Sequence, residues 1–402
     1  MKYVVMLCDG MADEPIEALG GKTPLEYAKT ENMDKLSKKS EIGLAHTIPE
    51  GMSPGSDTAN LAVLGYDPKK YYSGRSPLEA LSIGVPMDDS DIAIRCNVVT
   101  LEENEEKAFE DLTIIDHSSG EISTEDAAVL IKAVSDALAN ERFQFYVGTS
   151  YRHCLIDKTG SVVELTPPHD ILTKRIGDYL PKEASLLDMM KKSYNILKDH
   201  PINIERKKAG KNPANCCWFW GAGTKPMLDS FEEKTGLKGA MISAVDLLKG
   251  IAVGADMKVI AVEGADGGLN TNYEGKCEAA FESLKSPDCD FVYIHVEAPD
   301  EMGHQGSYER KVKAIENIDA RIIGPLCEKL NTEGIDFKML VLPDHPTPVR
   351  LRTHTSNPIP YLLYDSTKDC GMGLTYGETD AAKSDIFVAN GYTLINRMID
   401  RD

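Results

Sequence analysis

The chain has 402 residues, of which 42% are apolar, so it is long enough to bury a sizeable core and to form more than one domain. Its formal net charge of −20, from 44 basic and 64 acidic residues, argues against a nucleic acid or an anionic membrane as a partner. A small anionic substrate would need a local cluster of Arg and Lys.

The N-terminal segment and the cysteines indicate the compartment. Six uncharged residues separate Lys2 from Asp9, too few for the apolar region of a signal peptide, and no run approaches the length of a membrane span. The nine cysteines, an odd number without a repeated short spacing, are typical of reduced thiols. We therefore expect a cytoplasmic protein with no membrane partner.

The first part of the chain is expected to contain short strands and helices. An apolar run at residues 3–8 predicts a buried strand that delivers Asp9 to a loop. Pro54 and Gly55 end one element, and the apolar run 59–64 predicts a helix, so Ser56 should lie near the start of that helix. The other expected elements are helical pieces at 23–28, at 33–36 and after Pro77, and a strand at 43–47.

Residues 89–226 have the pattern of a separate α+β unit. Helices are expected at 124–138 and 184–197. The expected strands are 92–100, 142–147, 152–157, 161–165 and 215–220.

From Lys238 onward, strands and helices alternate, which favours a parallel sheet covered by helices on both faces. The expected strands are 240–244, 258–262, 291–296 and 338–342. The expected helices are 245–250, 274–284 and 308–330. Active residues in sheets of this kind lie beyond the carboxyl ends of the strands.

Six aspartates and histidines follow the ends of expected strands. They are Asp9, Asp300, His304, Asp344, His345 and His354. Carboxylate oxygens and neutral imidazole nitrogens are ligands that Zn, Mn and related divalent ions accept. Together with Ser56 they give seven candidate ligands, as expected for two metals with open positions. Two such ions about 4 Å apart can lower the pKa of a serine hydroxyl and neutralise the charge on a transferring phosphoryl group.

Each part of this set also has a simpler interpretation. Ser56 after Pro-Gly is consistent with a helix N-cap, and an isolated D-x-x-x-H or Asp-His pair is common by chance. A binding module without catalysis would require the seven side chains to be scattered in space. Their joint placement at the ends of strands favours the two-metal interpretation.

In this order, the seven residues resemble the metal-and-nucleophile signature of the alkaline phosphatase superfamily. The chain as a whole resembles the archaeal-type cofactor-independent phosphoglycerate mutases, essentially from end to end. The motifs are Asp-Gly-Met-Ala-Asp at 9–13, Pro-Gly-Ser-Asp-Thr-Ala-Asn-Leu at 54–61, Gly-Arg-Ser-Pro-Leu-Glu-Ala at 74–80, Arg-Cys-Asn at 95–97, Tyr-Arg-His at 151–153 and Asn-Thr-Asn-Tyr-Glu-Gly-Lys at 270–276.

The resemblance implies an α/β fold of the alkaline phosphatase type, with a doubly wound, mostly parallel sheet. Residues 1–88 and 227–402 would form the discontinuous catalytic domain, and residues 89–226 would form an inserted α+β cap that binds substrate.

The resemblance also implies the chemistry. One metal would be held by Asp300, His304 and His354, and the other by Asp9, Asp344 and His345, with Ser56 at the second metal as nucleophile. Ser56 would take the phosphoryl group from 3-phosphoglycerate and return it to the 2-hydroxyl, so no bisphosphoglycerate is needed. The ligand types admit Mn, Zn, Mg or Co, and the oligomeric state is left open.

The substrate is expected to be a small phosphorylated anion, which needs cationic partners. We expect these to be Arg95, Arg152 and Lys249, with His153 and Asn97 nearby. A structural or solvated role is the alternative for each of them.

The cap departs from the family pattern at two positions. Trp220 stands in Phe-Trp-Gly-Ala-Gly where these mutases carry an arginine, and Glu121 stands where a histidine is often found. An indole with a single donor cannot replace an arginine fork that binds carboxylate or phosphate. The alternative is therefore a homoserine kinase-like phosphotransferase of the same family. A phosphatase or sulfatase is a weaker one, because a long polar cap favours retention of substrate over hydrolysis.

Overall fold

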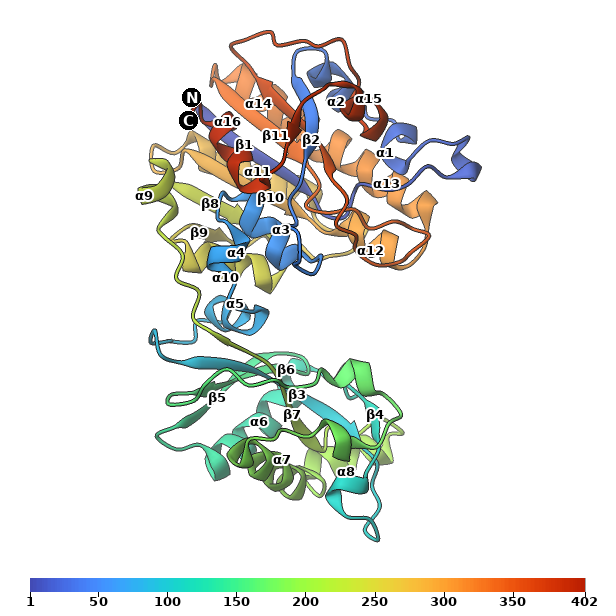
Figure 1. Ribbon diagram of the computed structural model, residues 1–402, viewed down its shortest axis with the longest axis vertical. Coiled ribbons are helices and arrows are strands. Elements are labelled where there is room, and N and C mark those ends of the chain that lie inside the picture. Colours follow the sequence, from blue (N-terminus) through green and yellow to red (C-terminus); the bar gives the residue numbers. More distant parts are fainter. Residues whose placement is uncertain (402) are drawn as a thin grey trace. The chain divides into compact units, whose positions relative to one another are not determined.

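The computed structural model describes residues 1–401, which form two compact units (Figure 1). The first comprises Met1–Tyr72 and Leu228–Asp402, and the second comprises Ser73–Met227. The second unit begins before helix α5 (Arg75–Ser82) and not at residue 89 as expected. The reason is packing, because Ala80 in this helix lies in one apolar cluster with Ala93 and Ile156.

The first unit is built on an eight-stranded sheet. Its order is β13 (Phe387–Val388), β2 (Glu41–Ala45), β12 (Ile359–Asp365), β11 (Phe337–Leu342), β1 (Lys2–Cys8), β10 (Phe291–Val296), β8 (Gly239–Ile242) and β9 (Lys258–Ile260). Strand β12 runs antiparallel to both of its neighbours, and the other pairings are parallel. The central strands β1, β10 and β11 are apolar and almost entirely buried, as expected for a sheet covered on both faces.

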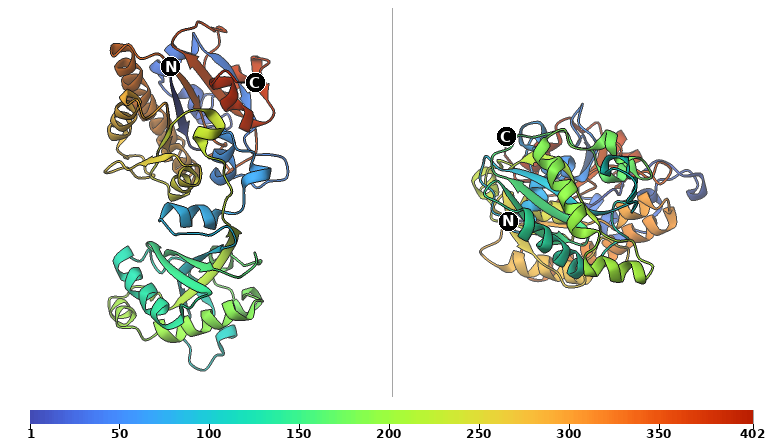
Figure 2. Two further views of the ribbon diagram at one scale, coloured as in Figure 1. Left: turned by 90° about the vertical axis from the view of Figure 1, so that its left-hand side faces the viewer. Right: turned by 90° about the horizontal axis from the view of Figure 1, so that it is seen from below.

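Helices cover both faces of this sheet (Figure 2). One face packs against α1 (Pro24–Tyr27), α2 (Glu31–Ser37), α11 (Tyr273–Lys285), α13 (Tyr308–Ile318) and α14 (Gly324–Thr332). The remaining helices of the unit are α3 (Ser56–Val63), α4 (Pro68–Tyr71), α9 (Phe231–Thr235), α10 (Asp246–Gly254), α12 (Ala298–His304), α15 (Glu378–Lys383) and α16 (Leu394–Met398). The fold class predicted from the sequence, a mostly parallel sheet between helices, is confirmed.

The second unit is an α+β structure. Its strands are β3 (Ile92–Leu101), β4 (Ile114–Asp116), β5 (Phe143–Thr149), β6 (Arg152–Asp157) and β7 (Cys216–Thr224). Strand β3 lies between β6 and β7 and is antiparallel to both. The helices after α5 are α6 (Thr124–Leu138), α7 (Ala184–Leu197) and α8 (Pro201–Lys208). Apolar residues of α6 and α7 form the core of this unit with residues of β3 and β7.

Two elements that were predicted from the sequence differ in the structure. Residues 161–165, predicted as a strand, have no ladder partner, although Val163 and Leu165 pack against the core. The helix predicted over 308–330 is interrupted by a π-helical turn, Asp319–Ile323. Pro325 follows this turn, and a proline cannot continue an α-helical hydrogen-bond ladder without disruption. No helix in residues 1–401 is long and apolar enough to span a membrane.

Candidate active site

The three central strands of the first unit bring the candidate ligands to one edge of the sheet. In the parallel register, Cys8 pairs with Val296 and Leu7 pairs with Leu342. The segments that follow β1, β10 and β11 therefore start side by side. These segments carry Asp9, Asp300 and Asp344.

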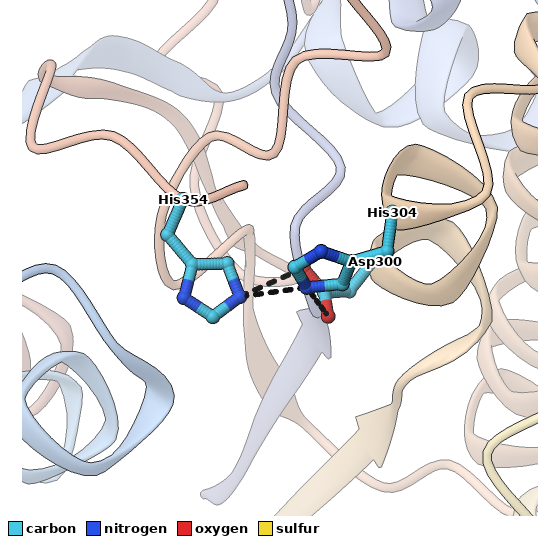
Figure 3. Close-up of side chains that lie close together, drawn as sticks. All are labelled: Asp300, His304 and His354. Carbon is cyan, nitrogen blue, oxygen red and sulfur yellow. Dashed lines mark hydrogen bonds and ion pairs between the residues drawn. The ribbon is translucent and has the colours of Figure 1, made fainter. Parts of the chain in front are cut away.

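The first candidate cation-binding group consists of Asp300, His304 and His354 (Figure 3). Asp300 and His304 lie one turn apart on α12, and His304 Nε2 is 3.1 Å from Asp300 Oδ2. His354 comes from the loop after β11, and its Nε2 is 3.0 Å from His304 Nε2 and 3.5 Å from Asp300 Oδ1. These are the residues expected for the first metal.

The second group consists of Asp9, Asp300 and His345. His345 Nε2 lies 3.7 Å from Asp9 Oδ1 and 3.1 Å from the hydroxyl of Ser56. The expected set had Asp344 in place of Asp300. Asp344 lies next to this group, with Oδ2 3.3 Å from His345 Nε2. Asp300 thus belongs to both groups and joins them.

Asp344 is held by hydrogen bonds that fix its orientation. Its Oδ1 accepts from Gly10 N at 3.1 Å, and its Oδ2 accepts from Asn60 Nδ2 at 3.0 Å. Asn60 also donates to the carbonyl of Ser56 and accepts from the hydroxyl of Tyr293. One amide side chain therefore ties the start of α3 to the Asp344 carboxylate.

Ser56 is the first residue of α3, and the N-cap is Gly55. The interpretation of Ser56 as an N-cap is therefore wrong, because its hydroxyl points to His345 and does not cap the helix. First-turn amides and the helix dipole favour negative charge at this position. This is a suitable environment for a side chain that carries a phosphoryl group.

The electrostatics of the site show a surplus of negative charge. Burial and the neighbouring carboxylates of Asp344 and Asp300 raise the pKa of Asp9 well above its usual value. Burial also acts to raise the pKa of Asp300, but hydrogen bonds with His304 and His354 outweigh it and hold this pKa below its usual value. The same contact with Asp300 raises the pKa of His304 to about 9. A bound cation would relieve this repulsion between carboxylates.

The donor set fits divalent cations. Asp9 Oδ1 is buried and has no hydrogen-bond partner among the described residues, so an acceptor is left for a cation. His304 Nδ1 is 3.0 Å from the carbonyl of Arg352. When Nδ1 donates to this carbonyl, the lone pair of His304 Nε2 can bind a cation in the first group. Asp, His and Ser donors suit Zn, Mn and related ions.

Three further side chains support the ligands and were missed by the sequence analysis. His295 is fully buried, with Nε2 2.8 Å from Asp9 Oδ2 and Nδ1 3.0 Å from the hydroxyl of Ser243. Its position inside an apolar strand was a usable signal, because a buried imidazole needs partners. Thr347 is also buried and donates its hydroxyl to Asp300 Oδ1.

Lys311 is the third. It is fully buried on α13 and donates to Asp13 Oδ2 at 2.7 Å and to the carbonyl of Thr347 at 2.8 Å. It therefore joins the loop after β1 to the loop after β11.

A glycine is required at position 10 because neighbouring side chains approach its backbone closely. Its φ is +59°, and a Cβ atom there would lie 2.5 Å from both Asp300 Oδ1 and Thr347 Oγ1. A side chain at this position would displace a shared ligand of both groups.

The expected substrate-binding residues of the second unit divide into two sets. Arg95 and Asn97 lie on β3, and Arg152 pairs with Asn97 on β6, so these three share one face of the sheet. His153 points to the opposite face and is 5% exposed, and burial lowers its pKa to about 3. The structure does not place His153 with the three others.

Trp220 and Glu121 lie in different surroundings. Trp220 donates its indole N–H to Asn97 Oδ1 at 3.1 Å, and the guanidinium of Arg95 lies 4.0 Å from its ring centre. Glu121 lines a cavity of about 460 Å³ together with Arg206. Trp220 is therefore in contact with two of the expected substrate-binding residues.

Lys249 lies in the first unit, on α10. Its Nζ is 3.1 Å from Asp246 Oδ1, one turn earlier. Helix α10 packs against α3, the helix that begins with Ser56. Lys249 therefore lies on a helix that contacts the helix of the candidate nucleophile.

Comparisons with known proteins identify relatives of this chain. The model of the 2,3-bisphosphoglycerate-independent phosphoglycerate mutase family matches residues 37–203. A protein of that name from Methanosarcina barkeri is 48% identical over 405 residues, which cover 99% of both chains. Since the relatives carry mutase names, the homoserine kinase alternative is not favoured.

Solved structures that resemble this chain include a member of the same family. A structure of a protein from Pyrococcus horikoshii has a TM-score of 0.81 and 31% identity, covering 99% of this chain and 96% of that one. The cofactor-independent phosphoglycerate mutase from Thermoplasma acidophilum has a TM-score of 0.67 and 27% identity, covering 100% of this chain and 99% of that one. The chain belongs to the family of archaeal-type 2,3-bisphosphoglycerate-independent phosphoglycerate mutases.

Proposed function

We propose that this chain interconverts 3-phosphoglycerate and 2-phosphoglycerate through a transient phosphoserine at Ser56. The observation that carries the proposal is the position of the Ser56 hydroxyl. It lies at the first residue of α3 and 3.1 Å from His345 Nε2. The same His345 nitrogen is 3.7 Å from Asp9 Oδ1 and 3.3 Å from Asp344 Oδ2. This is the geometry of a nucleophile within an acidic, cation-binding site.

Two divalent cations would be held by the described groups. Asp300, His304 and His354 would hold one, and Asp9, His345 and the neighbouring Asp344 would hold the other, with Asp300 between them. When bound, such ions neutralise charge on a transferring phosphoryl group and lower the pKa of a nearby hydroxyl. The identity of the ions is open among Mn, Zn, Mg and Co.

The transfer balances in two steps. The Ser56 oxygen bonds to phosphorus while the bond from phosphorus to the 3-oxygen of the substrate breaks, and the serine proton ends on the 3-hydroxyl. The 2-hydroxyl then attacks the phosphoserine, the bond to Ser56 breaks, and the serine regains a proton. The first-turn amides of α3 favour the negative charge of the phosphoserine throughout. The phosphoryl group that leaves the 3-oxygen is the one that returns to the 2-oxygen, so bisphosphoglycerate is not needed as a phosphoryl donor.

Arg95, Asn97 and Arg152 are the proposed contacts of the glycerate part, and Lys249 is the proposed contact of the phosphoryl group. Support for the first three comes from their shared face on the second unit, and support for Lys249 comes from the packing of α10 against α3. His153 keeps an indirect role in this proposal, because it lies behind that face.

The test compares Ser56→Ala with Ser53→Ala. Ser53 is an exposed serine three residues earlier, so it serves as a matched control. With Mn²⁺ and without bisphosphoglycerate, phosphorus NMR should show turnover by the wild type and Ser53→Ala and none by Ser56→Ala. Calorimetry should show that Ser56→Ala still binds Mn²⁺. Surviving turnover in Ser56→Ala would contradict the nucleophile, and a metal-loaded wild type without turnover would contradict the mutase activity.

A further inference from the structure

A series of buried hydrogen bonds lies behind Asp9 and connects it to the end of strand β8. His295 on β10 is fully buried, and its Nε2 is 2.8 Å from Asp9 Oδ2. On the other side of the ring, His295 Nδ1 is 3.0 Å from the hydroxyl of Ser243, the residue that follows β8. Ser243 is also buried, and its oxygen accepts from Val245 N at 3.0 Å. The imidazole is therefore held between two polar groups.

The hydrogen-bonding capacity of these groups determines the tautomer of His295. With a cation bound at the second group, Asp9 is ionised, and an ionised carboxylate only accepts hydrogen bonds. His295 Nε2 then carries the proton that is donated to Asp9 Oδ2, and Nδ1 of the neutral ring is an acceptor. Among the described residues, the hydroxyl proton of Ser243 has no acceptor other than this Nδ1. Ser243 therefore favours the tautomer that donates to Asp9.

The main chain of His295 is held as well. Lys276 is buried, and its Nζ donates to the carbonyl of His295 at 2.8 Å. Lys276 is the last residue of the motif Asn-Thr-Asn-Tyr-Glu-Gly-Lys, in which Asn272 caps α11 by accepting from Gly275 N. The proposed reaction gives this motif no role. The structure shows that the motif supplies a residue that holds the backbone behind Asp9.

Only one oxygen of Asp9 remains for a cation. Oδ2 accepts from His295, whereas Oδ1 is buried and has no hydrogen-bond partner among residues 1–401. Asp9 Oδ1 lies 3.7 Å from His345 Nε2, another candidate ligand of the second group. The shared residue Asp300 is restricted in a similar way, because Thr347 donates to its Oδ1. The second group therefore offers few carboxylate oxygens together with an imidazole nitrogen.

We propose that Ser243 and His295 are positioning residues that restrict Asp9 to one ligand oxygen and thereby select a transition-metal ion such as Mn²⁺ over Ca²⁺ at the second group. This selection rests on the proposed function, in which the second group holds a cation. Ca²⁺ takes about six to eight oxygen ligands, often two from one carboxylate, so a carboxylate with one free oxygen beside an imidazole suits it poorly. Transition-metal ions accept imidazole nitrogen beside single carboxylate oxygens.

The test titrates the metal-free, full-length chain with Mn²⁺ and with Ca²⁺ by calorimetry. Ser243→Ala removes the donor to His295 and releases Asp9 Oδ2. Mn²⁺ binding at one of the two sites should weaken by roughly 10–100-fold, the usual cost of losing a residue that orients a metal ligand. Ca²⁺ binding should not weaken, so the preference for Mn²⁺ falls by a similar factor. Ser243→Thr keeps the hydroxyl and should keep the preference.

Ser193→Ala is the matched control. Ser193 is fully buried in the second unit, and its oxygen accepts from Cys217 N at 2.9 Å, much as Ser243 accepts from Val245 N. Ser193→Ala therefore removes a comparable buried hydroxyl and should leave the preference for Mn²⁺ unchanged.

Two further measurements examine whether Ser243 acts through His295. ¹⁵N NMR of the histidine rings is recorded with Zn²⁺ bound, because Zn²⁺ is a d¹⁰ ion and diamagnetic. The signal that His295→Gln removes should show the Nε2-protonated tautomer in the wild type and a mixture of tautomers in Ser243→Ala. In the His295→Gln background, Ser243→Ala should cause no further change in the preference for Mn²⁺ over Ca²⁺.

The selection would be overturned by an unchanged preference for Mn²⁺ in Ser243→Ala, by an equal loss of preference in Ser193→Ala, or by a protonated Nδ1 in the wild type. A wild type that binds neither cation would refute the proposed cation site together with the selection. Selection of Mn²⁺ that depends on Ser243, in a metal-loaded chain without mutase turnover, would refute the proposed mutase activity and leave the selection standing.

Discussion

Thr347 joins the two cation-binding groups through one hydroxyl. It donates to Oδ1 of Asp300, the residue that both groups share, and lies 3.3 Å from His345 Nδ1. When His345 Nδ1 carries the proton, it donates a hydrogen bond to this hydroxyl. This contact favours the tautomer in which the unprotonated Nε2 faces Ser56. Thr347 therefore orients one ligand from each group.

Replacement of Thr347 by Val should weaken Mn²⁺ binding by roughly 10–100-fold, the usual cost of losing a residue that orients metal ligands. Thr347→Ser keeps the hydroxyl and serves as the control. Titration calorimetry on metal-free protein measures the affinity directly, without reference to activity. Equal affinities of the Val and Ser variants would contradict a role for the hydroxyl.

The sequence predicted which ligands meet, but not what holds them. Asp9, Asp300 and Asp344 could be predicted because the carboxyl ends of adjacent parallel strands share one edge. Gly10 and Thr347 could not, because their roles depend on a contact between loops that are more than 300 residues apart along the chain. The sharing of Asp300 likewise depends on side-chain positions.

At the scale of elements, the π-helical turn after α13 performs a capping role. Asp319 is its first residue and accepts hydrogen bonds from the backbone N–H groups of Asn32 and Met33 in the first turn of α2. Thr30, the N-cap residue of α2, provides no side-chain cap. The carboxylate from a distant helix therefore replaces the local cap.

Asp319→Ala should lower the free energy of unfolding by about 1–2 kcal/mol, because two amides at the start of α2 lose their acceptor. Glu328→Ala removes an exposed carboxylate from the following helix, α14, and is the control. Urea unfolding followed by circular dichroism measures both. The same stability in the two variants would show that α2 does not depend on this cap.

Most elements could be predicted because their apolar pattern matches their burial. Residues 291–296 and 338–342 are short apolar runs, and both became buried central strands. Residues 161–165 have the composition of a strand, but strand pairing depends on a partner that a local pattern does not reveal. The turn at Asp319–Ile323 was missed because the apolar spacing continues through it.

At the scale of the whole molecule, each unit has its own core, and the tryptophans report on only one of the two units. The cation-binding groups lie in the first unit, whereas both tryptophans, Trp218 and Trp220, lie on β7 of the second. A ligand that binds only the folded form stabilises it by about 2.7 kcal/mol at a free concentration 100 times its Kd. Metal should therefore stabilise the first unit selectively.

The expected result is a shift of one thermal transition. Addition of Mn²⁺ to metal-free protein should raise the calorimetric transition of the first unit and leave the tryptophan fluorescence transition in place. EDTA should reverse the shift. An equal rise of both transitions would show that the two units unfold together.

The most direct measurement of the central claim is the position of the phosphoryl group during turnover. Metal-loaded protein is mixed with 3-phosphoglycerate, quenched in acid, digested and analysed by mass spectrometry. The account predicts a phosphoserine at Ser56, which is absent without metal. Turnover with an unmodified Ser56, or with the phosphoryl group on another residue, would contradict it.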